Sequence, residues 1–294
     1  AERQRLAGFA TQGRRDGFAR NRSSAAGKGG GLIMIKRPTQ LVPPNLLSGA
    51  SPLKVLYHCL GYYDCPKQDD GLRLGPLCGY AGTYDDGQGG KKQYVGEVYY
   101  NFSQVEQLSH VLHWFALKIL AELNESGFTD FDAVLGAPMG GIALAEALAF
   151  NSARHFVFAE KKETVTGTEG RAKSVQVLNR HVVLPGMSVL LVEDVCNNFS
   201  TTEQIKSLIE SRGAELVGVV CAFNRSSHLS WKKHPIFSPA FIPTKQYRQD
   251  DPTVAHDIAV GRVEWKPKDV WLEKFRPLIA MYNRSSPPAC LTYE

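Results

Sequence analysis

The chain has no apolar run long enough to cross a membrane and no secretory signal with a hydrophobic core. A spanning helix needs about 20 mostly apolar residues, so we expect no membrane association. No two of the six cysteines have the C-x-x-C spacing of zinc or redox sites. A metal site at His58 with Cys59, Cys65 and Cys78 is the less favoured alternative to reduced thiols in a cytoplasmic protein.

Internal repeats are also absent, and low-complexity sequence is confined to the first 37 residues. That stretch is basic, rich in Gly, Ser and Ala and poor in large apolar residues, so it cannot bury enough surface to fold alone. We therefore predict a disordered leader or extension over residues 1–33, with Met34 as a plausible start. No helix-turn-helix or winged pattern precedes residue 91, so we expect no nucleic-acid partner despite the net charge of +5.

The rest of the chain divides into three predicted parts. Residues 34–90 are rich in Pro, Gly, Tyr and Asp and predict a peripheral N-terminal segment of loops with short local structure. Residues 91–230 alternate apolar strands with amphipathic helices, which indicates βαβ units and a parallel sheet. Residues 231–294 predict a C-terminal extension with a final helix that Asp269 caps and that serves only for packing.

Within the central part the expected elements have clear signals. The run 94–100 alternates as a strand does, and Ser103 and Glu106 have the spacing of a capping box at the start of a helix that Gly127 ends. Short apolar runs predict strands at 133–135, 156–159 and 216–223, and the charged stretch 160–174 predicts a loop. The expected fold is therefore α/β.

Residues 189–202, Val-Leu-Leu-Val-Glu-Asp-Val-Cys-Asn-Asn-Phe-Ser-Thr-Thr, are the most informative stretch. The aliphatic run predicts a buried parallel strand, which places Glu193 and Asp194 at its carboxyl end, where open α/β sheets bind ligands. A polar loop follows, and a helix is expected from near Thr202. Its free N–H groups favour a phosphate, while the paired carboxylates suit the two hydroxyls of a ribose. The alternative is an ordinary strand that ends in solvated acids.

That order of residues resembles the phosphoribosyl pyrophosphate (PRPP) signature of type I phosphoribosyltransferases. Three further features resemble the orotate phosphoribosyltransferases. The turn Gly136–Gly141 resembles their pyrophosphate loop, and Asn224-Arg225 resembles the site of their arginine for the orotate carboxylate. Tyr99-Tyr100-Asn101 resembles their paired aromatic residues followed by Asn, and this alignment places their base-site lysine at Lys91. The stretch from Glu160 to Lys173 is similar to their cationic hood loop. Each feature also has an ordinary structural interpretation: a common glycine-rich turn for 136–141, a surface arginine for Arg225, core strand residues for the tyrosines, and a solvated loop for 160–173.

The sequence departs from the family pattern at two places. Phe199 stands where the family's phosphate loop has Gly, which predicts a positive φ at Asn197 or Asn198 instead. Thr164 and Thr166 stand at the offsets of a second lysine and a histidine of the hood, and only Lys161 matches cleanly. The identity of the nucleobase that the protein accepts therefore stays open.

The resemblance implies a phosphoribosyltransferase fold with a Rossmann-like parallel sheet and a hood subdomain, a homodimer, and Mg²⁺ that enters with PRPP rather than a metal held directly. The implied reaction transfers phosphoribose to a nucleobase, most simply orotate; the alternatives are another base or a PRPP-binding regulator with little turnover. The implied catalytic residues are Glu193, Asp194 and Lys161. The residues implied to bind the base are Lys91, Tyr99, Tyr100 and Arg225. The implied PRPP-binding residues are Ala137, Pro138, Met139, Gly140, Gly141, Lys162, Arg171, Lys173, Asn197, Asn198, Ser200, Thr201 and Thr202.

Overall fold

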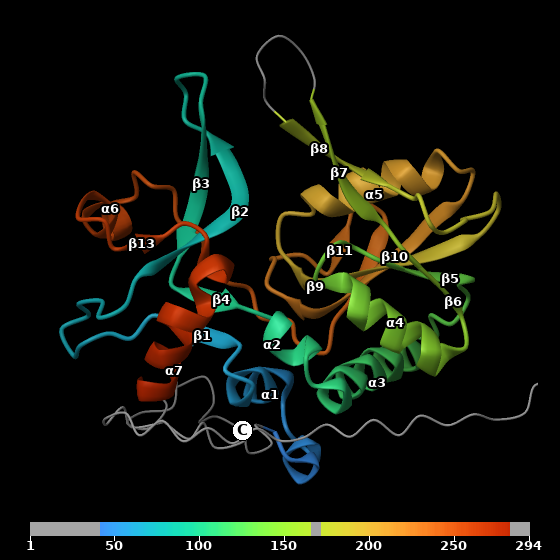
Figure 1. Cartoon of the computed structure of the whole chain (residues 1–294), viewed down its shortest axis with the longest axis horizontal. Helices are drawn as coiled ribbons and strands as arrows, with labels where there is room; N and C mark the ends of the chain where they lie inside the picture. The colour runs from blue at the N-terminus through green and yellow to red at the C-terminus, as the bar shows by residue number, and fades with distance from the viewer. Residues whose placement is uncertain (1–41, 166–171, 283–294) are drawn as a thin grey trace, which may run out of the picture. The chain divides into compact units, whose positions relative to one another are not determined.

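The largest sheet of the described chain has six strands (Figure 1). The computed structural model describes residues 42–165 and 172–282. The strand order is β11-β12-β10-β9-β5-β6, and all neighbouring strands are parallel except β11 and β12. The strands are β5 (Ala133–Gly136), β6 (His155–Phe158), β9 (Ser188–Cys196), β10 (Glu215–Asn224), β11 (Ser230–Trp231) and β12 (His234–Phe237). The predicted α/β class is confirmed.

Helices cover both faces of this sheet. Helices α3 (Ser109–Glu125) and α4 (Gly141–Ser152) share one apolar core with alternate residues of β9 and β10, such as Leu190 and Val220. Helix α5 (Ser200–Glu210) packs Ile205 and Ile209 against the opposite face. Because residues on both faces of β9 are buried, its apolar run is uninterrupted, as expected of a central parallel strand. Both α4 and α5 begin at the carboxyl-terminal edge of the sheet.

A second group of elements, here named the hood, combines segments from before and after the central sheet. Its strands are β1 (Tyr62–Asp64), β2 (Leu77–Asp85), β3 (Lys91–Gly96), β4 (Val98–Tyr100) and β13 (Val263–Glu264). Its helical segments are α6 (Pro252–Ala259), η2 (Pro267–Val270), η3 (Trp271–Phe275) and α7 (Arg276–Tyr282). Strand β13 pairs with β2, so residues far apart in sequence complete one small sheet.

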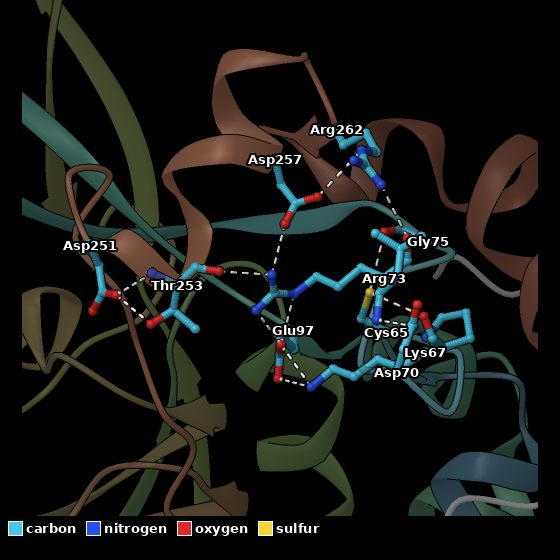
Figure 2. Close-up of polar contacts among 12 residues, drawn as sticks. Cys65, Lys67, Asp70, Arg73, Gly75, Glu97, Asp251, Thr253, Asp257 and Arg262 are labelled. Atoms are coloured by element: carbon cyan, nitrogen blue, oxygen red, sulfur yellow. Dashed lines mark hydrogen bonds and ion pairs between the residues drawn. The ribbon is translucent and has the colours of Figure 1, made fainter.

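A buried ion-pair network joins these two parts of the hood (Figure 2). Arg73 lies between Glu97 and Asp257, with nitrogen–oxygen distances of 2.6 and 2.7 Å. Arg262 contacts the same Asp257 carboxylate at 3.3 Å. Since Arg73 and Asp257 are about nine-tenths buried, the network couples Glu97, between β3 and β4, to α6 more strongly than exposed ion pairs would.

Several expected local features differ. The stretch 160–174 is largely a two-stranded antiparallel ribbon, β7 (Glu160–Val165) and β8 (Ala172–Val177), rather than a loop. Ser103 and Glu106 form no capping box: the Ser103 hydroxyl donates to Asn101, and the expected helix is split into α2 (Ser103–Glu106) and α3. Asp269 lies inside η2 and caps no helix.

The segment before residue 91 is more regular than expected, since it contains η1 (Pro44–Leu47), α1 (Pro52–His58) and the nine-residue strand β2. The predicted leader, residues 1–33, lies outside the described residues. Helix α6 and strand β12 were not predicted, because the four prolines in the stretch 231–252 suggested extended chain.

Candidate active site

Strand β9 carries the two acids to the edge of the sheet. It continues through Glu193 and Asp194 as far as Cys196, further than its apolar run alone predicts. The Thr202 hydroxyl on α5 donates to Glu193 Oε1 at 3.5 Å. The carboxylate of Asp194 is 16% exposed and forms an ion pair with Lys268 at 3.6 Å. The acid pair therefore faces the region between β9, α5 and the hood.

The turn before α4 lies directly against this acid pair. A Cβ placed on Gly140 would overlap the Asp194 carboxylate, and one on Gly141 would overlap the backbone carbonyl of Val192. Only glycine permits this approach, so the turn at 138–141 requires its glycines for contact and not merely for flexibility. The N-terminus of α4 consequently lies close to the acids.

The loop before α5 adopts a different backbone conformation from the expected one. Phe199 itself adopts the left-handed conformation, with φ of 57°, so the prediction of a positive φ at Asn197 or Asn198 was wrong. The residue is only 8% exposed, and its ring stacks on Trp231 with centroids 6.1 Å apart. Burial of the ring offsets the backbone strain, which for a residue other than glycine costs about 1 kcal/mol or more. Helix α5 begins at Ser200 rather than near Thr202.

These elements enclose a cavity of about 410 Å³. Its walls are the turn 138–140, the acids Glu193 and Asp194, the loop 197–199 and the first turn of α5. Lys161 on β7 and Lys268 on η2 complete the wall. Thus the predicted residues Pro138, Met139, Gly140, Lys161, Glu193, Asp194, Asn197, Asn198, Ser200, Thr201 and Thr202 surround one cavity. Two helix N-termini, those of α4 and α5, meet there with the carboxylates, an arrangement suited to a sugar with a phosphate at each end.

Carboxyl protonation in this cavity is shifted. Burial raises the pKa of Glu193 to about 8, and the nearby charge of Asp194 adds to the rise. Burial also raises the pKa of Glu106 to about 7, helped by Asp194, while Lys268 opposes the rise. The cavity wall therefore includes one carboxyl group that accepts a proton near neutral pH, that of Glu193, which is common at functional sites, whereas Glu106 is not part of the wall.

A second cavity, of about 530 Å³, shares Asn197 and Asn198 with the first. Its wall includes Arg225, and the stretch 243–246 lies across it. Arg225 follows β10 and is 5% exposed. Its guanidinium lies 3.9 Å from the ring centroid of Tyr80 and 5.9 Å from that of Tyr100.

The guanidinium is buried but incompletely satisfied. Neither Nε nor Nη2 of Arg225 has a hydrogen-bond partner among the described residues. A buried cationic group without its partners is costly, and a carboxylate would supply two acceptors in the geometry that an arginine fork fits. The second cavity thus has the chemistry of a site for an anionic planar ligand.

The other predicted residues lie elsewhere. Ala137 is buried below the turn, and Lys162 is exposed on the ribbon next to Lys161. Lys91 is exposed opposite Asp85 on the β2–β3 hairpin, outside the walls of both cavities. Of the two tyrosines, Tyr100 approaches Arg225, whereas Tyr99 packs against Trp271. Arg171 and the Lys173 side chain lie outside the described part.

Three wall or contact residues were missed. Tyr80 on β2 packs on Arg225, Gln246 donates to Asn197 Oδ1 at 2.7 Å, and Lys268 reaches Asp194. Each lies in a segment whose sequence indicated only loop, extended chain or packing. No spacing pattern relates them to the acid pair, since tertiary structure alone brings them together.

Over residues 42–165 and 172–282, no group of three or more His, Cys, Asp or Glu side chains is placed to hold a metal ion, and the alternative at His58 with three cysteines is therefore not formed. In the same ranges no helix combines the length and the apolar character needed to span a bilayer.

Comparison with known proteins gives a consistent family. Residues 116–253 match the family model described as "Phosphoribosyl transferase domain". The chain is 30% identical over 122 residues to an orotate phosphoribosyltransferase of Chlorobium phaeobacteroides, a match that covers 42% of this chain and 55% of the relative. It is 32% identical over 107 residues to an adenine phosphoribosyltransferase of Cutibacterium acnes, covering 34% of this chain and 60% of the relative. Each match spans little more than half of the relative.

Among solved structures, the chain is similar to the UMP synthase of Leishmania donovani, with a TM-score of 0.42 and 11% sequence identity. That alignment covers 64% of this chain and 35% of the other. The resemblance to phosphoribosyltransferases predicted from the sequence is confirmed by the family match and by the related sequences.

Proposed function

We propose that the chain transfers the 5-phosphoribosyl group of PRPP to a ring nitrogen of a nucleobase and releases pyrophosphate, since residues 116–253 match the family model of a phosphoribosyl transferase domain. The observation that carries this proposal is the single cavity in which the acid pair of β9 meets the N-termini of α4 and α5.

In this reaction the ring nitrogen of the base forms a bond to C1 of the ribose and loses its proton to water. The bond from C1 to the pyrophosphate oxygen breaks, and its electron pair leaves with pyrophosphate. No covalent enzyme intermediate is required, so catalysis consists of positioning and of stabilising charge. Glu193 and Asp194 accept hydrogen bonds from the ribose hydroxyls, the 5′-phosphate binds at the N-terminus of α5, and the pyrophosphate binds at the turn 138–141.

Mg²⁺ fits this site as a companion of the substrate. The described residues supply a pair of carboxylates here but no cluster that would hold a metal by itself. Bound to PRPP, Mg²⁺ would neutralise part of the pyrophosphate charge. The chain's own part is to hold the ribose hydroxyls and both phosphate groups in one orientation.

The base we propose is orotate, and the support is Arg225. Its buried Nε and Nη2 lack partners among the described residues, and it lines the cavity next to the proposed ribose site. Orotate carries a carboxylate that would satisfy this fork, whereas adenine does not. A purine acceptor is the second candidate, favoured by the similarity to an adenine phosphoribosyltransferase. The resemblance further implies a homodimer, which mass photometry would test.

The test is pyrophosphate release by the purified full chain with PRPP, Mg²⁺ and, separately, orotate, uracil, adenine and hypoxanthine. Turnover with orotate supports the proposal, and turnover with adenine alone supports the second candidate. Asp194→Asn serves as the negative control, because it keeps the shape of the side chain but removes its charge. PRPP binding without turnover on any base would contradict the enzymatic assignment.

A further inference from the structure

Lys268 lies at the acid pair although it belongs to the C-terminal part of the hood. Its ammonium is 3.6 Å from Asp194 Oδ2, and its side chain is half exposed. It lines the same cavity as the turn 138–140 and Lys161. Lys268 is also outside the segment that matches the phosphoribosyl transferase domain, which ends at residue 253.

The backbone that carries Lys268 is firmly held. Directly after η2, Trp271 is 2% exposed, stacks on Phe275 with centroids 5.1 Å apart and donates its indole N–H to the Leu60 carbonyl at 3.2 Å. On the other side, β13 pairs with β2, and a Cβ on Gly79 would approach the Trp265 carbonyl oxygen to 2.7 Å. The position of Lys268 is therefore fixed by packing on both sides of it, while its long side chain stays free to turn.

The charges around the cavity indicate a function for Lys268. A sugar diphosphate brings several negative charges next to the carboxylate of Asp194, which opposes its entry. Among the described residues of the cavity wall, Lys161 and Lys268 carry the positive side-chain charges. Both side chains are exposed, and Lys268 is the one whose ammonium forms an ion pair with Asp194.

We propose that Lys268 is a catalytic residue that contacts the pyrophosphate of PRPP, an assignment that rests on the proposed function. In the free protein its ammonium pairs with Asp194. When the ribose hydroxyls donate to Asp194, the ammonium turns to the pyrophosphate oxygens. As the C1–oxygen bond breaks, the electron pair moves onto the departing oxygen, and Lys268 donates a hydrogen bond to it while keeping its proton.

The experiment compares wild type with Lys268→Ala, Lys268→Arg and the control Lys266→Ala, in which an exposed lysine of the same segment is removed. Calorimetry measures the Kd for PRPP, for pyrophosphate and for ribose 5-phosphate, and pyrophosphate release measures kcat and KM. For Lys268→Ala we expect PRPP and pyrophosphate to bind about 10- to 100-fold more weakly, as for the loss of one charged hydrogen bond. Lys268→Arg should recover most of this loss, and Lys266→Ala should match wild type.

Ribose 5-phosphate separates this role from a structural one, because it lacks the pyrophosphate. Its Kd in Lys268→Ala should stay within about threefold of wild type. If Lys268 served only to pair with Asp194, all three ligands would weaken alike, and the assignment would be wrong. It would equally be wrong if an active wild type and Lys268→Ala were indistinguishable. If wild type itself bound neither PRPP nor pyrophosphate, the proposed function would fall first.

Discussion

The guanidinium of Arg73 donates to the carboxylate of Asp257, which lies 184 residues further along the chain, at 2.7 Å. The same guanidinium contacts Glu97. Removing Arg73 would take away the cation between these two largely buried carboxylates and leave each with one more exposed partner, Lys67 for Glu97 and Arg262 for Asp257. Arg73→Ala should therefore lower the free energy of unfolding by about 3 kcal/mol, measured by urea denaturation.

Arg248 provides the matched control for that measurement. It pairs with Asp250 at 3.3 Å, and both side chains are more than half exposed. Arg248→Ala should change the stability by less than about 1 kcal/mol. Equal effects at the two positions would show that burial of the Arg73 network contributes nothing.

Phe199 combines a strained backbone with a buried ring, and the two effects can be separated by substitution. Phe199→Ala and Phe199→Gly both lose the ring packing on Trp231, so both should be less stable than wild type. Only glycine adopts the positive φ without strain, so Phe199→Gly should be the more stable of the two by about 1 kcal/mol. At Ile205, inside α5, the order should reverse, with alanine favoured over glycine by about 1 kcal/mol. Thermal unfolding of the four variants tests both orders.

Glu193 should make the stability depend on pH. In the folded protein, burial and the charge of Asp194 raise the pKa of the Glu193 carboxyl to about 8. In the unfolded chain the same carboxyl loses its proton near the ordinary pKa of 4.5. Between these values the folded state binds more protons, so stability must fall as pH rises. We expect the drop in Tm between pH 5 and pH 8.5 to be smaller in Glu193→Gln than in wild type by several degrees, roughly as expected for 1–2 kcal/mol.

Glu106, whose pKa is raised to about 7, should contribute in the same direction, so Glu106→Gln should also flatten the profile. The exposed carboxyl of Glu125 is the control. A profile unchanged in Glu193→Gln would show that this carboxyl is ionised in the folded protein at neutral pH.

Arg225 is expected to set the affinity for a carboxylated base. Under the proposed function, Arg225→Lys keeps the charge but loses the two parallel hydrogen bonds, and the KM for orotate should rise by about 10- to 100-fold. The KM for PRPP should stay nearly constant. Because Arg225 packs on Tyr80, the Tm of Arg225→Lys must also be measured. A raised KM for PRPP with an unchanged KM for orotate would contradict this placement.

Local sequence signals were sufficient for four strands of the central sheet, β5, β6, β9 and β10. The run Val189–Val192 predicts β9 because both of its faces are buried, and the same holds for β10. The turn 138–141 and the loop after Glu193 were expected at one edge because parallel strands align their carboxyl ends. For these elements, pattern and tertiary structure agree.

The hood could not be predicted in the same way. Strand β2 is completed by β13, and Arg225 is covered by Tyr80, so the partners of each segment lie far away in sequence. At Phe199, backbone preference alone favoured a shift of the positive φ to a neighbouring asparagine. The burial of the ring, which depends on Trp231, overrode that preference.

The pairing of β13 with β2 sets an order for folding during synthesis. Residues 133–224 hold four neighbouring strands of the main sheet and can associate as soon as they emerge from the ribosome. Residues 62–100 must wait for residues 252–275 before their own small sheet and its aromatic core close. A nascent chain halted before Val263 would thus carry a formed main sheet beside an unfinished hood whose exposed apolar strands are prone to aggregate.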